Sequence, residues 1–201
     1  MTKTASIKTA STRTSSARPL GARIAVAALA LALGAAPVSA FAKNPMVGGA
    51  PMYASKTIVE NAVNSKDHTT LVAAVKAAGL VDTLSGPGPF TVFAPTNAAF
   101  AKLPPGTVET LVKPENKATL TAILTYHVVP GALTAKDLAA MVKQGGGQAL
   151  LKTVNGAQLS VEMKGKKVYV TDAKGNTAAV TIANVMQSNG VIHVVNGVLQ
   201  P

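Results

Sequence analysis

Cysteine is absent from this sequence of 201 residues, and so is tryptophan. Without thiols the chain can form neither the disulfide bonds nor the thiolate metal sites that hold many small exported domains together. Its stability must therefore come from the burial of apolar side chains. An apolar content of 48% over this length is sufficient for a hydrophobic core, so we expect one folded domain.

Arginine is lacking from every position after Arg23, and aromatic residues make up only 3% of the chain. Five of the eleven net positive charges belong to the first 42 residues, so the rest of the chain carries +6, with lysine as its only strongly basic residue. Specific nucleic-acid recognition relies on the arginine fork for phosphates and guanine edges, and on aromatic side chains for base stacking. We therefore expect no nucleic-acid partner.

Acidic residues are missing from the first 42 positions. Basic residues from Lys3 to Arg23 precede an apolar run over residues 24–36. That run is shorter than the roughly 20 residues that span a bilayer, and Ala40-Phe41-Ala42 supplies small residues for a cleavage site. This pattern predicts a cleavable signal peptide over 1–42, and therefore a secreted or periplasmic protein with no stable membrane span after cleavage. An uncleaved membrane anchor is the alternative.

The chain after the predicted signal peptide divides into two parts. Residues 43–53 contain prolines and glycines, which are typical of an exposed segment, and we expect a flexible lead-in there. Patterned hydrophobicity begins shortly afterwards, so the domain itself is expected over residues 54–201.

Two stretches have the pattern of core strands. Residues 90–100 alternate in hydrophobicity until Pro95 removes the next backbone donor, and Thr96 is placed to cap the helical turn that follows. Residues 189–199 are apolar on both faces and bracketed by Asn-Gly turns, as in a central strand. We expect the two stretches to pair. Their characteristic residues are Phe90, Phe93, Pro95, Thr96, Phe100, Gly190, His193 and Asn196.

Three short boxes in the chain resemble those of fasciclin (FAS1) domains. Thr-Val-Phe-Ala-Pro-Thr over residues 91–96 resembles the first box, and Gly-Val-Ile-His-Val over 190–194 resembles the closing box. Tyr126-His127 matches the Tyr-His dipeptide between them. The resemblance covers about residues 54–200 and is closest to the bacterial, secreted, single-domain type. Asn196 stands where the closing box usually has Asp.

Helical and strand periodicities occupy different parts of the chain, which predicts the α+β class. We expect a mostly antiparallel sheet with helices packed at one side, and the resemblance implies a FAS1-like β-sandwich or wedge. Residues 128–131 are expected to form a turn, and Thr134-x-x-Asp137 a capping box. Strands separated by glycine turns are expected over 148–153, 158–163, 167–171 and 178–183.

No catalytic or metal-binding motif is apparent. His68, His127 and His193 have no second ligand at metal-ligand spacing, no serine lies in a Gly-x-Ser-x-Gly elbow, and the glycine runs lack the residues of a phosphate loop. We therefore expect no cofactor, no metal and no enzymatic activity. His127 and His193 lie on apolar faces, so we expect both as buried histidines with hydrogen-bonded rings.

Two groups of residues are candidates for contact with a partner. In animal FAS1 domains the Tyr-His region is associated with integrin-dependent adhesion, so the resemblance makes Tyr126 and His127 candidate adhesion residues. Their place at the end of an apolar helix face favours a core role instead. A hairpin tip supplies the second group, which either contacts anionic polysaccharide or lipid headgroups or is a solvated turn: Lys164, Lys166 and Lys167.

These observations predict a non-catalytic binding or cell-adhesion module at the cell surface or in the extracellular matrix. Its expected partner is a surface protein or a matrix component. The alternative is a carrier of a small apolar ligand such as a carotenoid, because some secreted fasciclin proteins that resemble this one bind carotenoids. The Val-, Ala- and Met-rich surface between sheet and helices is suited to such a ligand.

Overall fold

Seven strands form the main sheet of the computed structural model, which describes residues 44–201; the predicted signal peptide lies outside the described residues. The strands are β3 (Phe90–Pro95), β4 (Val128–Pro130), β5 (Gln148–Lys152), β6 (Gln158–Lys164), β7 (Lys167–Thr171), β8 (Thr177–Gln187) and β9 (Gly190–Val195). Their order across the sheet is β4-β3-β9-β8-β7-β6-β5. All neighbours are antiparallel except β3 and β9, so the prediction of a mostly antiparallel sheet is confirmed.

Strands β3 and β9 pair in parallel, from Phe90 opposite Gly190 to Pro95 opposite Val195. The expected pairing of the two stretches is therefore confirmed. Both strands are buried along nearly their whole length, which explains why both of their faces are apolar. Gly190 is required at the start of β9, because a Cβ atom there would collide with the carbonyl oxygen of Phe90.

The sheet curls until its two edges approach each other. Val154, just after β5, donates its backbone N–H to the carbonyl of Val128 in β4 over 2.8 Å. The expectation of a turn over 128–131 is wrong for its first three residues, since β4 pairs there with β3. Burial of Val128 and Val129 against β3 stabilises an extended segment that is too short to show a strand period in the sequence.

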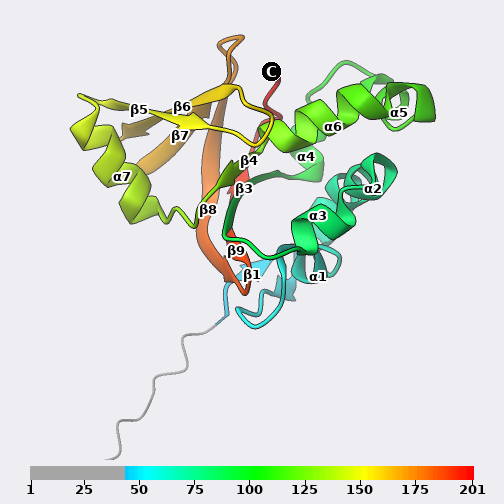
Figure 1. Ribbon diagram of the computed structural model, residues 1–201, viewed down its shortest axis with the longest axis horizontal. Coiled ribbons are helices and arrows are strands. Elements are labelled where there is room, and N and C mark those ends of the chain that lie inside the picture. The colour runs from blue at the N-terminus through cyan, green and yellow to red at the C-terminus, as the bar shows by residue number, and fades with distance from the viewer. Residues whose placement is uncertain (1–43) are drawn as a thin grey trace, which may run out of the picture. The chain divides into compact units, whose positions relative to one another are not determined.

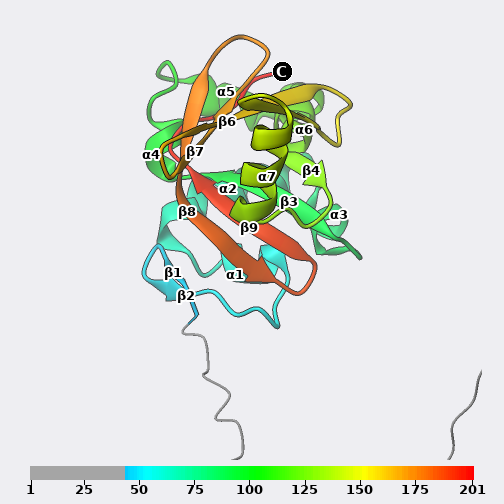
Figure 2. The same ribbon diagram turned by 90° about the vertical axis from the view of Figure 1, so that its left-hand side faces the viewer.

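Helices cover the two faces of this sheet unequally. They are α1 (Ile58–Ala62), α2 (Thr69–Ala78), α3 (Val81–Ser85), α4 (Asn97–Phe100), α5 (Thr107–Leu111), α6 (Lys117–Tyr126) and α7 (Ala135–Gln144), with 3-10 helices η1 (Lys66–His68) and η2 (Pro114–Asn116). Helices α1 to α6 gather on one side, whereas α7 lies against β5, β6 and β7 (Figure 1). In the view turned by 90°, α7 lies in front of β9 and α2 lies behind it (Figure 2). The α+β class is confirmed.

Two cores lie on opposite faces of β3 and β9, because alternate residues of a strand point to opposite faces. The helical core lies between the sheet and helices α1 to α6. Its buried members are Val47, Met52, Ile58, Leu71, Ala74, Val75, Ala78, Leu84, Val92, Ala94, Phe100, Leu120, Leu124, Val128, Val185, Ile192 and Val194. The sheet core lies inside the curled sheet and under α7. Its buried members are Phe93, Tyr126, Val129, Leu138, Val142, Ala149, Leu151, Leu159, Val161, Val168, Val170, Ala178, Val180, Val195 and Leu199.

Side-chain caps begin two of the helices where the sequence predicted them. The Thr96 hydroxyl accepts a hydrogen bond from the backbone N–H of Ala99 at the start of α4. At α7, the Thr134 hydroxyl accepts from the N–H of Asp137, and the Asp137 carboxylate accepts in return from the N–H of Thr134. Both caps satisfy backbone donors that the first turn of a helix leaves unpaired.

A small hairpin precedes the first helix, where the sequence predicted a flexible lead-in over residues 43–53. Strands β1 (Met46–Val47) and β2 (Ala50–Pro51) pair across Gly48-Gly49. Val47 and the following Met52 are buried in the helical core. The expectation of an exposed strip is therefore corrected, because these two side chains remove enough apolar surface from water to hold the hairpin against the domain.

Candidate functional site

Tyr126 ends α6, and its side chain is fully buried in the sheet core. Its hydroxyl donates to the carbonyl of Gln158 over 2.8 Å and accepts from the N–H of Ala173 over 3.0 Å. Burial raises the pKa of this phenol, and the N–H of Ala173 opposes the shift only in part. Tyr126 therefore links α6 to β6 and to the turn after β7, and its ring is not accessible to a partner.

His127 is the C-terminal cap of α6. Unlike the side chain of Tyr126, its side chain lies against the helical core. Its Nε2 accepts a hydrogen bond from the N–H of Leu199 over 3.0 Å. The proton of the neutral ring is therefore on Nδ1, which donates to the carbonyl of Ile123 over 2.8 Å. Burial lowers the pKa of His127 to about 4. The neutral imidazole thus ties the C-terminal segment to the last turn of α6.

His193 has the same kind of environment within β9. Its Nδ1 accepts from the N–H of Asn184 over 3.4 Å, so Nε2 carries the proton and donates to the carbonyl of Leu133 over 2.8 Å. The ring stacks on Phe93 with centroids 5.7 Å apart. Burial lowers the pKa of His193. Both ring nitrogens are therefore used to connect the loop before α7 with β8 and β9.

Asn196, just after β9, takes part in three hydrogen bonds. Its side-chain oxygen accepts from the N–H of Ala179 over 2.8 Å, and its own N–H donates to the Ala179 carbonyl over 3.1 Å. The carbonyl of Asn196 accepts from the ammonium group of Lys102 over 2.8 Å. The residue is therefore a joint between β8 and the chain that leaves β9.

The lysine tip, defined as Lys164, Lys166 and Lys167, is exposed at the β6–β7 turn. Lys164 and Lys167 lie directly opposite each other in the ladder, an arrangement of like charges that is mildly destabilising. The Nζ atom of Lys164 lies 3.9 Å from the Glu162 carboxylate and 5.3 Å from the centre of the Tyr169 ring. Of these three lysines, only Lys164 forms an ion pair with an acidic residue in the described part of the chain. The tip therefore presents positive charge to solvent.

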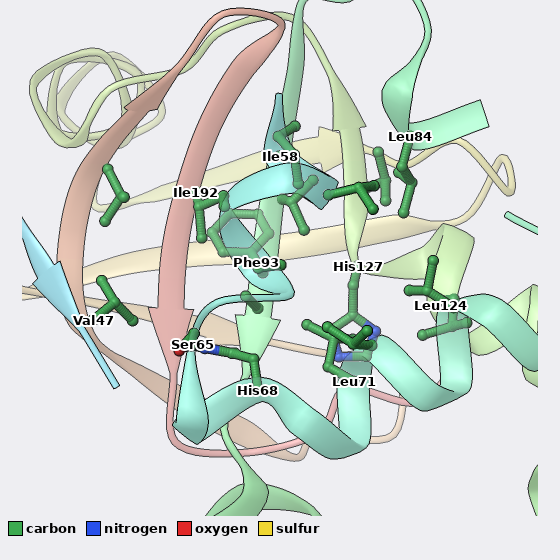
Figure 3. A pocket seen from close by; sticks show the side chains of 18 of the residues that line it. Val47, Ile58, Ser65, His68, Leu71, Leu84, Phe93, Leu124, His127 and Ile192 are labelled. Atoms are coloured by element: carbon green, nitrogen blue, oxygen red, sulfur yellow. Dashed lines mark hydrogen bonds between the residues drawn. The ribbon is translucent and has the colours of Figure 1, made fainter. Parts of the chain in front are cut away.

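A cavity of about 50 Å³ lies within the helical core, between the sheet and the helices. Apolar side chains from the hairpin, the helices and the strands form most of its wall, among them Met52 and Val92. Figure 3 shows Val47, Leu71, Leu124 and Ile192 at this wall. Four lining residues carry polar groups: Ser65, His68, Lys76 and His127. One water molecule needs roughly 10–15 Å³ of such space, so the cavity has room for more than one water.

His68 is the polar residue that distinguishes this cavity. The residue is only 3% exposed, and its Nδ1 lies 2.8 Å from the hydroxyl of Ser65. Within residues 44–201, its Nε2 is the one buried side-chain nitrogen or oxygen without a hydrogen-bond partner. Burial lowers the pKa of His68; the nearby carbonyl of Ala94 opposes this shift but lies outside hydrogen-bond geometry. A neutral imidazole therefore borders an apolar cavity with one nitrogen unpaired.

Contacts from distant parts of the chain hold His68 in place. The N–H of Lys66 donates to the carbonyl of Gly48 over 3.2 Å, and a Cβ atom at Gly48 would collide with the Ser65 hydroxyl. On the other side, the Asn97 side chain donates to the Lys66 carbonyl over 2.9 Å and accepts from the N–H of Thr70 over 3.0 Å. The hairpin and the start of α4 thus fix η1 and the imidazole that it carries.

The sequence prediction did not include His68 or the hairpin in any site. A signal for the hairpin does exist, because Gly48-Gly49 lies between apolar residues and both glycines have positive φ, as a type I′ turn requires. The unpaired nitrogen of His68 has no such signal, since its burial depends on residues that are distant in the sequence on either side. Of the predicted site residues, His127 lines this cavity, Tyr126 lies in the sheet core, and the lysine tip is a separate surface.

Within residues 44–201, no three His, Asp or Glu side chains gather closely enough to hold a metal ion. The same part of the chain contains no helix whose length and hydropathy would let it cross a membrane.

Comparisons with known proteins agree with this architecture. A family model described as "Fasciclin domain" matches residues 66–201. Protein sll1483 of Synechocystis sp. is 51% identical over 159 residues, which cover 79% of this chain and 81% of that protein. Transforming growth factor-beta-induced protein ig-h3 of Sus scrofa is 37% identical over 145 residues, which cover 72% of this chain but only 19% of that larger protein.

A solved structure has the same fold. It is a FAS1 domain pair from the insect cell adhesion molecule fasciclin I, with a TM-score of 0.65 and 20% sequence identity. The match covers 73% of this chain and 51% of that one.

Proposed function

Because this chain belongs to the fasciclin domain family, we propose that it is a non-catalytic binding or adhesion module that acts outside the cytoplasm, at the cell surface or in the surrounding matrix. The observation that carries the proposal is the use of its polar side chains. The polar side-chain groups of Tyr126, His127 and His193 form hydrogen bonds with backbone groups of the domain itself. What the domain offers to a partner is therefore surface shape and charge.

The insect protein of the same fold supports the adhesive part of this proposal, because it is a cell adhesion molecule. Burial of Tyr126 and His127 favours a supporting role for the dipeptide over direct contact with a partner. Loss of adhesion on substitution of either residue would then follow from loss of folded protein.

We assign the contact with an anionic partner to the lysine tip. Its three ammonium groups project from one turn and are only slightly neutralised, so they favour a polyanionic polysaccharide or an acidic surface protein through a long-range, salt-sensitive attraction. Such a contact between exposed charges weakens as ionic strength rises.

Attachment to surfaces coated with residues 43–201 tests this function. We expect saturable attachment of cells from the native source, and reduced attachment with Lys164→Ser, Lys166→Ser and Lys167→Ser combined. The matched control removes the same charge elsewhere, with Lys113→Ser, Lys117→Ser and Lys143→Ser, three lysines that are also exposed. Attachment no greater than to an uncoated surface would overturn the adhesive function, and equal loss with both triple variants would remove the tip from it.

Export through cleavage of the predicted signal peptide is part of the proposal. Material released by the native cells should begin at Lys43, and intact-mass measurement decides this. A mass that retains residues 24–36 would favour the membrane-anchored alternative.

A second function, carriage of a small apolar ligand, is favoured by the cavity in the helical core. Pockets that enclose drug-sized ligands have volumes of roughly 300–1,000 Å³. The cavity of about 50 Å³ is therefore too small to enclose a carotenoid, and it favours a compact molecule. Native mass spectrometry of protein purified from its source tests carriage, because a carrier retains one small ligand per chain and an adhesion module alone does not.

A further inference from the structure

The unpaired nitrogen of His68 points to the chemistry of the ligand. We propose that the helical-core cavity binds a compact, uncharged, mostly apolar molecule that carries one hydroxyl group, and that this hydroxyl hydrogen-bonds to Nε2 of His68. The inference rests on the second proposed function, carriage of a small ligand, and names its ligand class.

The wall of the cavity requires an apolar ligand body. Valine, leucine and isoleucine side chains from several parts of the fold surround the space (Figure 3), and Met52 also lines it. Of the other three polar residues at the wall, two are already engaged: the Ser65 hydroxyl contacts His68, and both ring nitrogens of His127 are bonded to the backbone. The third, Lys76, is exposed to solvent. Among the described residues, the ligand therefore meets one buried side-chain nitrogen or oxygen without a partner, Nε2 of His68.

That single atom argues against water as the natural occupant. A buried water is stable when it makes two to four hydrogen bonds, and an apolar cavity that cannot provide them stays dry. Here the space exceeds that of one water, but among the described residues His68 is the one side chain with an unpaired buried atom. An amphiphilic molecule fits a cavity with an apolar wall and one unpaired nitrogen, because its one polar group bonds to Nε2 and its carbon atoms contact the apolar wall.

The hydroxyl follows from the two possible tautomers of His68. If Nδ1 donates to the Ser65 oxygen, Nε2 is an acceptor and needs a donor from the ligand. If the Ser65 hydroxyl donates to Nδ1, Nε2 carries the proton and needs an acceptor. A hydroxyl group serves both cases. Because burial lowers the pKa of His68, the ring is neutral at neutral pH and gives no counter-charge to a carboxylate ligand.

A matched pair of probes tests the inference on the intact chain from residue 43. Cyclopentanol and cyclopentane have the same carbon ring and differ by one hydroxyl. Titrations are followed through the methyl NMR signals of Leu71, Val92 and Ile192 and through the ¹⁵N shift of His68 Nε2. We expect both probes to shift the methyl signals and only cyclopentanol to shift the Nε2 signal.

The variant His68→Leu separates the hydroxyl from the apolar body. We expect it to weaken cyclopentanol binding by about three- to tenfold, the worth of one hydrogen bond, and to leave cyclopentane binding unchanged. If the variant does not fold, the wild-type Nε2 shift still decides. Failure of both probes to bind would overturn carriage by this cavity. Binding of both probes with no Nε2 shift, or with only water found at Nε2 in the alcohol complex, would overturn the hydroxyl assignment and leave carriage standing.

Discussion

The two cores of this domain share strands β3 and β9 but are packed differently. In the sheet core, large side chains such as Leu138, Leu159 and Val161 are fully buried, and the polar groups of Tyr126 and His193 are paired. The helical core contains a cavity and an unpaired imidazole nitrogen. Around the sheet core, hydrogen bonds between neighbouring strands hold the curled sheet together. Around the helical core, the helices and the hairpin belong to separate segments of the chain, and their packing leaves a cavity. From this difference we infer that the sheet core maintains the fold, and that the helical core provides the proposed ligand site.

The largest effect should come from opening the sheet core. Phe93 is fully buried and stacks on His193, so Phe93→Ala should lower the free energy of unfolding by about 3–5 kcal/mol. Urea unfolding measures the change, with Phe90→Ala, at a half-buried position of the same strand, as the milder control. Equal midpoints for Phe93→Ala and the parent protein would show that the sheet core does not hold the fold.

Acidification should destabilise the domain almost as strongly. In the unfolded chain the pKa of His127 is close to 6.5, whereas in the folded chain it is about 4. The unfolded state therefore binds the proton first as the pH falls. The free energy of unfolding should decrease from about pH 6.5 downwards, by roughly 3 kcal/mol at pH 4 from this group alone. The variant His127→Gln should flatten this dependence in pH-dependent unfolding curves, and parallel curves would contradict the assigned environment.

Loss of one hydroxyl from the sheet core should have an intermediate effect. Tyr126→Phe leaves the Gln158 carbonyl and the Ala173 N–H without their partner, which should cost about 1–3 kcal/mol. Tyr169→Phe, on a half-buried face, is the control and should change stability by less than about 0.5 kcal/mol. If Tyr126→Phe reduced cell attachment with an unaltered melting curve, Tyr126 would be a binding residue instead of a brace.

The smallest effect is expected at Val92, and its comparison with Val161 gives the sharpest contrast between the two cores. Val92→Ile adds one methylene beside the cavity and should stabilise the domain by about 0.5–1 kcal/mol. Val161→Ile adds the same group at a fully buried position of the sheet core and should destabilise the domain by about 1–3 kcal/mol. Thermal unfolding of both variants tests the signs, and two changes of the same sign would mean that the cores are packed alike.

Much of the fold could be predicted because it depends on local patterns. The turns at Asn155-Gly156 and Gly165 separate β5, β6 and β7 as expected, and Thr96 and Thr134 cap the predicted helices. β4 was missed because three residues before a glycine turn carry no strand period. The sequence does not predict the hairpin because its prolines and glycines are typical of loops, whereas its stability comes from burying Val47 and Met52.

The site was less predictable than the fold for a physical reason. Hydrogen-bonded histidines in a core were expected at His127 and His193 from their apolar neighbours in the sequence. The state of His68 depends on Gly48 and Asn97, which contact its surroundings only after folding. A missing hydrogen bond is a property of three-dimensional packing and leaves no pattern in the chain.

Crystallography under xenon pressure distinguishes the two cores without any substitution, because xenon binds in apolar cavities and requires no particular polar group. We expect xenon density in the helical core, within contact of Val92, Ile192 and the His68 ring, and none in the sheet core around Leu159 and Val161. Xenon in the sheet core, or in neither core, would contradict the difference in packing between them.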